Sequence, residues 1–154
     1  MPGRYSFRPM DDADAREVAR WKYAPPYDFY NSDADPADLS ELLDPERREG
    51  AYFSVLDGGE LVGFFQFERG GEVVDVGLGL RPDLTGRGYG LDFVLAGLDF
   101  ARQRFTPGRF TLSVATFNGR AIRVYERAGF RRGGVYLHET NGGTHEFLAM
   151  ERQA

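Results

Sequence analysis

The sequence predicts an α+β fold in which a mixed, mostly antiparallel sheet carries helices on both faces. Three observations lead to this class: strand-patterned segments follow one another between residues 52 and 80, a helix-patterned segment then lies between two strands, and the chain ends in a hairpin. A chain of 154 residues suits one domain, because a domain of this size buries roughly 70% of its unfolded surface. We therefore expect a single domain over residues 1–154.

The first segments predict a strand and a helix. Residues 5–10 alternate between apolar and polar side chains, which is typical of a strand. The Asp11-Asp12 pair that follows suits a helix start. A modest apolar face then supports a helix from residue 12 to about Trp21.

An aromatic loop and a second helix come next. Residues 22–31 contain two consecutive prolines, which exclude a regular helix, and several crowded aromatic side chains. Residues 35–43 place Pro36 where a first helical turn tolerates it, and their leucines form one face. We expect the Asp-Pro pair at 44–45 to end this helix.

The middle of the chain predicts an antiparallel meander of three strands. Residues 52–56 and 61–67 are apolar strand segments joined by Asp-Gly-Gly-Glu, which is a strong hairpin signal. A second glycine pair at 70–71 leads into the third strand, residues 72–80. Consecutive strands joined by such short turns are expected to pair with one another.

The last third predicts a long buried helix, a strand, a short helix and a terminal hairpin. Apolar residues of the long helix recur at helical spacing over a wide surface. Asn118 is a favourable N-cap for the short helix and Gly129 a favourable C-cap. An Asn-Gly-Gly turn separates the two final strands. The expected segments are 91–105, 110–115, 118–129, 130–139 and 144–150.

Composition limits the classes of function. The chain has no cysteine, which excludes a disulfide framework, thiol catalysis and a cysteine zinc site, and its two histidines argue against a metal centre. A formal net charge of −5 offers nucleic acid no broad basic face, although it tolerates a cationic amine. No apolar run reaches the length of a signal peptide or a membrane span, so we expect a cytoplasmic protein without a membrane partner.

An anion-binding turn is expected between Leu78 and Gly90, where a strand passes into the long helix. Gly86, Gly88 and Gly90 leave little side chain in the way, and the first N–H groups of the helix have no internal partner. The spacing fits neither the dinucleotide fingerprint nor a nucleoside-triphosphate loop. By itself the turn also suits a structural connector, so a second motif is needed to identify a ligand.

That second motif begins at Asn118. A small residue, Ala121, follows it by three positions, Tyr125 by seven, and Gly-Phe stands at 129–130. Together with the glycine turn, this pattern resembles the GNAT (GCN5-related) N-acetyltransferase superfamily. The resemblance implies a GNAT-like acyl-CoA N-acyltransferase fold and transfer of an acetyl group from acetyl-CoA to a primary amine by direct attack, without a metal.

The resemblance also implies where acetyl-CoA binds. Glycines inside the strand 72–80 suggest a close backbone approach by a ligand, and in the family this strand splays from its neighbour and holds the donor. Thr85 departs from the usual Gln or Arg, but the family's contacts there are largely backbone amides. The expected donor-binding residues are Leu78, Leu80, Thr85, Gly86, Arg87, Gly88, Tyr89, Gly90, Leu91, Asn118 and Arg123.

Arginines near the second motif are candidates for the 3′-phosphate of coenzyme A, because guanidinium groups suit phosphate. We assign Arg123 to this phosphate, although each arginine of the group also suits a solvated charged face. The group consists of Arg120, Arg123, Arg131 and Arg132.

Tyr125 is the expected general acid. It lies two helical turns after Asn118, so both side chains project from one helix face and can contact one extended ligand. The resemblance places Tyr125 at the thiolate sulfur of the donor and Asn118 at the pantetheine or acceptor end.

Asp75 is the expected general base. It is an ionisable residue inside an apolar strand, on the same pleat face as Gly77 and Gly79. It equally suits a cap on a neighbouring loop or a partner for an arginine. Ser113 stands where other family members place an acid and cannot serve as a base. The alternatives are Glu72, Glu146 and His138, any of them acting through a water chain.

The aromatic loop is the expected acceptor site. Ring faces together with nearby aspartates suit a cationic amine, although the loop also suits a lid packed over the core. A peptide acceptor instead needs an open groove between this loop and the terminal hairpin. A non-catalytic acyl-CoA-binding regulatory domain is the alternative function, and a homodimer through the loop or the hairpin edge stays open. The expected acceptor residues are Trp21, Tyr23, Tyr27 and Tyr30.

Overall fold

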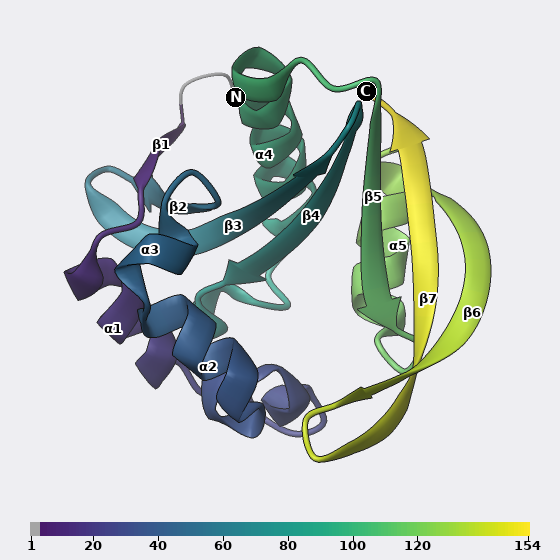
Figure 1. Cartoon of the computed structure of the whole chain (residues 1–154), viewed down its shortest axis with the longest axis horizontal. Helices are drawn as coiled ribbons and strands as arrows, with labels where there is room; N and C mark the ends of the chain where they lie inside the picture. The colour runs from purple at the N-terminus through teal and green to yellow at the C-terminus, as the bar shows by residue number, and fades with distance from the viewer. Residues whose placement is uncertain (1–3) are drawn as a thin grey trace.

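Residues 4–154, which a computed structural model describes, form a seven-stranded sheet with helices against both faces (Figure 1). Residues 1–3, which belong to the start of the chain considered for a signal peptide, lie outside this range. The strands are β1 (Tyr5–Pro9), β2 (Tyr52–Asp57), β3 (Glu60–Gly70), β4 (Val73–Leu80), β5 (Arg109–Ala115), β6 (Arg131–Thr140) and β7 (Gly143–Gln153).

The sheet is mixed and mostly antiparallel, as the sequence predicts. Its strand order is β1-β2-β3-β4-β5-β7-β6. The expected meander is present because β2, β3 and β4 pair antiparallel in sequence order. The terminal hairpin of β6 and β7 is also antiparallel, whereas β4 and β5 run parallel. Their parallel direction follows from the long helix that connects them.

The helices begin and end at residues whose chemistry explains them. Asn118 Oδ1 accepts from the Ala121 N–H at 3.1 Å, and Gly129 adopts the left-handed backbone at φ +97°. The expected helix end at Asp44-Pro45 is followed by another short helix, because Asp44 accepts from the Glu46 N–H. The helices are α1 (Asp12–Arg20), α2 (Pro36–Leu43), α3 (Pro45–Arg48), α4 (Gly90–Phe105) and α5 (Gly119–Arg127), with short 3₁₀ turns at Tyr27–Tyr30, Ser32–Ala34 and Pro82–Leu84.

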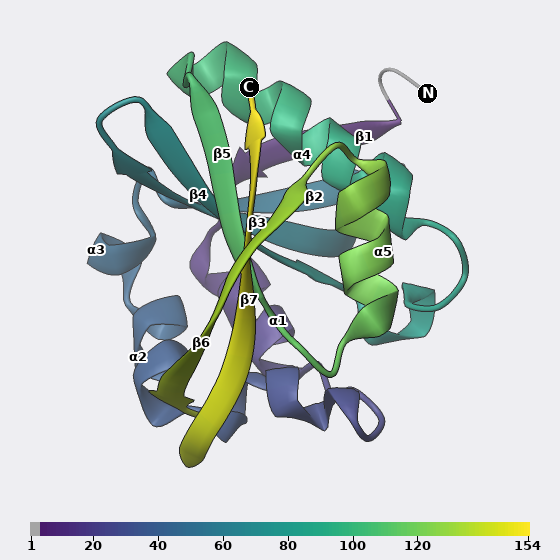
Figure 2. The ribbon, with the colours of Figure 1, turned by 90° about the vertical axis from the view of Figure 1, so that its right-hand side faces the viewer.

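Each face of the sheet has its own hydrophobic core. In β3 the alternation of side chains sends Phe65 and Phe67 into the core shared with α4 and α5, and Phe64 toward the core shared with α1 and α2. Trp21 and Leu42 complete the second core. Figure 2 shows α5 and α2 on opposite sides of the sheet, which confirms the expected layering.

The one parallel pair separates partway along its length. β4 and β5 are in register only from Val73 to Asp75 on β4, opposite Arg109 to Thr111 on β5. Beyond Asp75 the two strands diverge, and Figure 1 shows them as the two sides of a V. The sheet therefore opens a gap in its middle, and this gap positions the candidate site.

A buried carboxylate ties α1 to the sheet and carries a stability prediction. Asp14 is 7% exposed and accepts from Arg8 Nη2 at 3.0 Å and from the buried Ser54 hydroxyl at 2.7 Å. Asp14→Ala is expected to lower the free energy of unfolding by about 1–3 kcal/mol, because it leaves the Ser54 hydroxyl buried without a partner. Urea denaturation of both proteins measures the difference.

Asp33→Ala is the matched control. Asp33 also pairs with a basic residue, Lys22, at 2.6 Å, but both side chains are more than half exposed. Exposed ion pairs contribute little, so the unfolding midpoint should stay close to that of the wild type. An equal loss in the two variants would contradict a special role for the buried carboxylate.

Candidate active site

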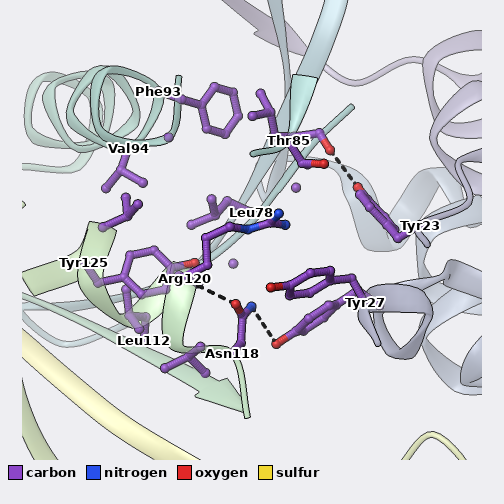
Figure 3. Close-up of a pocket in the computed structure, with 18 of the residues that line it drawn as sticks. Tyr23, Tyr27, Leu78, Thr85, Phe93, Val94, Leu112, Asn118, Arg120 and Tyr125 are labelled. Atoms are coloured by element: carbon purple, nitrogen blue, oxygen red, sulfur yellow. Dashed lines mark hydrogen bonds between the residues drawn. The ribbon is translucent and has the colours of Figure 1, made fainter. Parts of the chain in front are cut away.

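A cavity of about 530 Å³ fills the gap between β4 and β5. This volume lies within the usual range for small-molecule sites. Its walls come from β4, β5, the start of α4, one face of α5, and the loop that follows α1 (Figure 3). Five separate segments of the chain thus meet at one opening.

The wall formed by β4 contains backbone N–H and C=O groups that make no hydrogen bond to a neighbouring strand. The Arg81 N–H donates across to Val62 O at 2.8 Å, on the β3 side. Backbone groups alternate in direction along an antiparallel ladder, so those of Leu78 and Leu80 face the gap. The Leu80 carbonyl accordingly accepts from Tyr23 Oη at 2.8 Å rather than from a strand. The N–H and C=O of Leu78 are directed to the same side.

The glycine turn forms the end of the cavity at the start of α4. Gly86 and Gly88 adopt positive φ angles of 71° and 86°, and both line the cavity with Gly90. A Cβ at Gly88 would meet nothing within 4 Å. No side chain caps the first turn of α4. Its free N–H groups therefore make a site that favours an anion.

Thr85 has a structural hydrogen bond in this turn. Its hydroxyl donates to the Pro82 carbonyl at 2.7 Å and so closes the short 3₁₀ turn before the glycines. Thr85 still lines the cavity. The side chain that differs from the family pattern is thus engaged with the backbone, so the groups that this turn offers to a ligand are mainly those of the main chain.

Arg120 is the basic side chain that reaches the glycine turn. Its guanidinium lies 4.0 Å from the centre of the Tyr27 ring, and a Cβ at Gly86 would meet its Nη1 at 3.2 Å. Arg123, the residue expected from the sequence, is exposed and does not line the cavity. Arg132 instead pairs with Glu126 at 3.1 Å.

Tyr125 and Asn118 both line the cavity, as their spacing on one helix face predicts. Figure 3 shows the Tyr125 ring projecting from α5 into the cavity. Burial raises the pKa of the Tyr125 hydroxyl above its ordinary value, and the nearby Tyr30 adds to the shift. Tyr125 therefore keeps its proton at neutral pH.

Asn118 connects α5 to the loop across the cavity. Its Oδ1 caps the helix, while its Nδ2 donates to Tyr30 Oη at 3.1 Å. Burial raises the pKa of Tyr30. The amide thus spans from the helix start to the aromatic loop and lies 8% exposed.

The aromatic loop covers the cavity as a lid and also lines it. Trp21 is 8% exposed and packs against Phe64 in the second core. Tyr23 is fixed to the β4 carbonyl, and burial raises its pKa. The Arg120 guanidinium covers one face of the Tyr27 ring, so an amine cannot bind to that face. All four residues expected to bind the acceptor line the cavity.

Asp75 does not line the cavity. It lies on the pleat face of Gly77, at the last paired position before the strands part, and accepts from Thr111 Oγ1 at 2.7 Å. Burial raises its pKa, the Thr111 hydrogen bond opposes the rise, and Glu68 adds to it. Among the described residues that line the cavity, none carries a carboxylate or an imidazole. Ser113 lines it and accepts from Tyr136 Oη at 2.7 Å.

Three other residues expected at the donor site also lie outside the cavity lining. Tyr89 lies beside Arg4, with 5.1 Å from guanidinium to ring centre, and Leu91 packs on the larger core. Neither they nor Arg87 line the cavity. The sequence analysis missed Ser32 and nine apolar lining residues, and nothing in local spacing separates those nine from ordinary core positions. The missed residues are Val18, Ser32, Phe64, Val76, Phe93, Val94, Leu112, Val114, Ala121 and Val124.

Two further observations concern the described part of the chain. Within residues 4–154, no three His, Cys, Asp or Glu side chains gather as a metal site. None of the helices in that range is long and apolar enough to cross a bilayer.

Comparison with known proteins shows several similar acetyltransferases. A mycothiol acetyltransferase of Acidothermus cellulolyticus is 39% identical over 67 residues, which are 44% of this chain and 20% of that relative's length. A spermidine N-acetyltransferase of Vibrio cholerae, solved with CoA and spermine, superposes with a TM-score of 0.76 at 20% identity, over 97% of this chain and 95% of that one.

Two other solved structures show the same fold. A GNAT-family acetyltransferase of Bacillus anthracis gives a TM-score of 0.75 at 19% identity, over 97% of this chain and 95% of that one. A ribosomal-protein-S5-alanine acetyltransferase of Vibrio fischeri gives 0.65 at 18%, over 97% and 93%. The family model described as an acetyltransferase (GNAT) domain matches residues 4–131, which is most of the chain. The chain therefore belongs to the GNAT acetyltransferase family.

Proposed function

We propose that this protein is an N-acetyltransferase that moves an acetyl group from acetyl-CoA to a primary amine. The observation that carries the proposal is the meeting, in one cavity, of the free β4 backbone, the uncapped start of α4 and the protonated Tyr125. An extended thioester with a diphosphate at one end needs these three features. The residues present therefore fit acetyl-CoA as the donor.

Each part of the cavity has a role in binding the donor. The glycine turn and Arg120 supply N–H groups and a positive charge for the diphosphate. The gap-facing backbone of Leu78 and Leu80 suits the pantetheine arm and the thioester carbonyl, whose oxygen gains negative charge as the amine attacks. Acetyl-CoA supplies the acetyl group as a thioester.

Tyr125 holds a proton where the sulfur of the donor would leave. Because burial keeps the hydroxyl protonated, it can donate to a developing thiolate throughout the neutral pH range. The chain has no cysteine to form an acyl-enzyme thioester. The amine is therefore proposed to attack the donor directly while both substrates are bound.

The lid favours a small amine over a peptide. A peptide would need an open groove between the aromatic loop and the terminal hairpin. Instead, the hairpin tip is joined to the loop side: Thr140 Oγ1 donates to Asp35 at 2.7 Å, and Asn141 Nδ2 donates to the Phe29 carbonyl. His145 also packs on the Phe29 ring, with 4.7 Å between ring centres. This closure supports a small acceptor.

Asp75 is proposed to take the amine proton through water, since it lies outside the cavity lining. A base must be ionised, so kcat/KM should rise with pH as Asp75 loses its proton. Burial raises its pKa, which places the midpoint of this limb above the ordinary carboxyl value of about 4. Asp75→Asn should remove the limb and lower kcat/KM on the plateau.

The pH profiles of wild type and variant, measured with one amine, check this assignment. An unchanged low-pH limb in Asp75→Asn would show that Asp75 is not the general base and would leave Glu72, Glu146 and His138 as the candidates. Each of these can then be replaced in turn by its neutral analogue and its profile measured in the same way.

A second candidate function is a non-catalytic acyl-CoA-binding domain. The lack of a carboxylate or imidazole among the described lining residues supports it. Calorimetry with acetyl-CoA, CoA and desulfo-CoA, followed by thiol-release assays across amines and peptides, separates the two. Binding with amine-dependent thiol release supports the transferase, and binding without release from any acceptor supports the regulatory domain. A lack of binding would contradict both.

A further inference from the structure

The cavity passes through the sheet, and its acceptor half lies on the face covered by α1 and α2. Gly77 and Gly79 of β4 stand opposite Gln66 and Phe64 of β3, so these four residues share one face. Phe64 packs against the core shared with α1 and α2, whereas Leu78, between the two glycines, packs against the core shared with α4 and α5. Residues from both sides line the cavity. The chemistry open to the acceptor therefore follows from the walls on the first of these faces.

The walls of the acceptor half are aromatic and apolar. A Cβ at Gly79 would collide with the Phe64 ring, so this ring occupies the space over β4 that a side chain would fill. Trp21 tilts against the Phe64 ring with 6.5 Å between ring centres, and Val18 lines the same side. Figure 3 shows the Tyr23 ring entering the cavity from the lid. An uncharged ring of an acceptor would match these surroundings.

The charges around the acceptor half disfavour a cation. Among the described residues that line the cavity, the one charged side chain is Arg120, which is basic and lies near the glycine turn. On α2, Glu41 accepts from Gln66 Nε2 at 3.2 Å. At the N-cap of that helix, Asp35 accepts from Thr140 Oγ1 at 2.7 Å. Neither carboxylate lines the cavity, so an ammonium group of the acceptor would be buried without a counter-charge, which is unfavourable.

We propose that the acceptor is an arylalkyl monoamine, that is, a primary amine joined through a short alkyl chain to an uncharged aromatic ring. This inference rests on the proposed function and names the substrate class of the same site. The ring would lie beside Trp21 and Phe64, because aromatic rings favour offset or edge-to-face contacts. Its burial would provide affinity in proportion to its apolar area, without a charged partner. The amine would then point to the gap between β4 and β5.

The transfer to such an amine balances without leaving a charge in the acceptor half. The nitrogen lone pair forms the new N–C bond to the acetyl carbonyl carbon, and the C–S bond breaks with its electron pair on sulfur. One amine proton leaves through water to Asp75, which shares the face of Gly77 on β4, and Tyr125 protonates the thiolate. The products are an uncharged amide and CoA.

A diamine tests the missing counter-charge directly. The attacking nitrogen must be neutral in every acceptor, but the far nitrogen of a diamine must also lose its proton before it enters uncharged walls. At pH 7.4 roughly one alkylammonium group in a thousand is neutral, because its pKa is about 10.4. A monoamine should therefore be preferred by about 10²- to 10³-fold in kcat/KM, and by about tenfold less for each unit of pH above 7.4. Tyr23, Tyr30 and Tyr125 add no negative charge over this range, because burial raises the pKa of each hydroxyl.

Thiol release with a matched pair of amines measures this preference. Hexylamine and 1,5-diaminopentane have the same number of non-hydrogen atoms and differ in whether the far end is a methyl group or an ammonium group. Hexylamine should give the higher kcat/KM by the factor above, and the ratio should shrink as the pH is raised. 2-Phenylethylamine should exceed hexylamine by about 2- to 10-fold, which is the gain expected from contacts between rings.

The single tryptophan of the chain, Trp21, gives a second readout that needs no turnover. Its ring lines the acceptor half, so a molecule bound there should change its fluorescence. With unreactive desulfo-CoA present, 2-phenylethylamine should give a saturable change in Trp21 emission. The same concentration of 1,5-diaminopentane should give none.

Ser32→Asp supplies the missing counter-charge. Ser32 lines the cavity from the lid, so a carboxylate at this position would lie in the wall of the acceptor half. The variant should raise kcat/KM for 1,5-diaminopentane by at least about tenfold. Ser40→Asp is the matched control, because Ser40 is exposed on α2 and does not line the cavity. It should keep the wild-type ratio, and circular dichroism checks that both variants are folded.

The outcomes separate the acceptor class from the proposed function. Equal or faster thiol release with 1,5-diaminopentane overturns the monoamine class and leaves acetyl transfer in place. An unchanged ratio in Ser32→Asp overturns the role of the missing counter-charge. A Trp21 response to 2-phenylethylamine without release from any amine supports the aromatic site and contradicts the transfer reaction. Donor binding with neither response overturns both.

Discussion

Tyr125→Phe is expected to lower kcat by about 10²- to 10⁴-fold, the range typical of a positioned proton donor. The variant removes one oxygen from a ring that projects into the cavity from α5 and keeps the ring's packing, including its contact with Phe130 at 6.2 Å between centres. Donor affinity is proposed to come from the glycine turn and the β4 backbone instead. The Kd of acetyl-CoA should therefore change by less than about threefold, a difference well below 1.4 kcal/mol.

Single-turnover kinetics and calorimetry on the same preparation measure the two quantities. Tyr5→Phe is the control, because Tyr5 also packs on the larger core but does not line the cavity. It should keep the wild-type kcat. A Tyr125→Phe enzyme with unaltered kcat would remove Tyr125 from the mechanism, and a large loss of donor affinity would indicate a binding role.

The pH profile gives Tyr125 a second test. Burial raises its pKa above the ordinary tyrosine value of about 10, so the hydroxyl stays protonated as the pH rises to that point. Loss of this proton should therefore produce no falling limb below about pH 10 in the wild type.

Gly88→Asp is expected to weaken acetyl-CoA binding by about 100-fold or more. Gly88 lines the cavity beside the uncapped start of α4, and open space lies where its side chain would be. An aspartate there would place a carboxylate in the proposed diphosphate site. Two unit charges 4 Å apart repel by about 4 kcal/mol at an effective dielectric constant of 20, and a loss of 2.7 kcal/mol is already about 100-fold.

Gly58→Asp separates this repulsion from backbone strain. Gly58 also has a positive φ, 60° against 86° for Gly88, and a Cβ there would likewise meet nothing within 4 Å. It lies in the turn between β2 and β3, away from the cavity. Both variants should lose some stability, because L residues rarely adopt this backbone. Only Gly88→Asp should lose donor affinity, and equal Kd values would contradict the anion site.

Arg120 and Arg123 illustrate what local sequence cannot resolve. Both stand on the same short helix, three residues apart, and both have the chemistry to bind phosphate. The structure directs Arg120 over Tyr27 toward the glycine turn and leaves Arg123 exposed. The difference depends on where the lid lies relative to α5, and the lid is about ninety residues earlier in the chain.

Asp75 likewise shows what the sequence pattern of a single strand cannot predict. Its alternation with Gly77 and Gly79 predicts that the three residues share one pleat face, and the register of β4 agrees with this. Whether it reaches the cavity depends on the point at which β4 and β5 part, and pairing persists through Asp75 itself. The side chain is consequently engaged by Thr111 on the neighbouring strand. The alternation of side chains along a strand predicts the face on which Asp75 lies. It does not predict at which residue β4 and β5 separate.

The sequence by itself determined the elements and the position of the glycine turn. Hairpin signals, caps and apolar periodicity act over a few residues, so the meander, the helix begun by Asn118 and the glycine turn could be located without a structure. The seven-residue step from Asn118 to Tyr125 likewise fixes a shared helix face.

Only the tertiary structure decided the shape and closure of the site. Asn118 meets Tyr30 across 88 residues of sequence, and Thr140 meets Asp35 across 105. These contacts close the lid over the cavity, and they form only after the sheet brings distant segments together. Local spacing carries no information about such contacts, because their geometry is set by the packing of whole elements rather than by neighbouring residues.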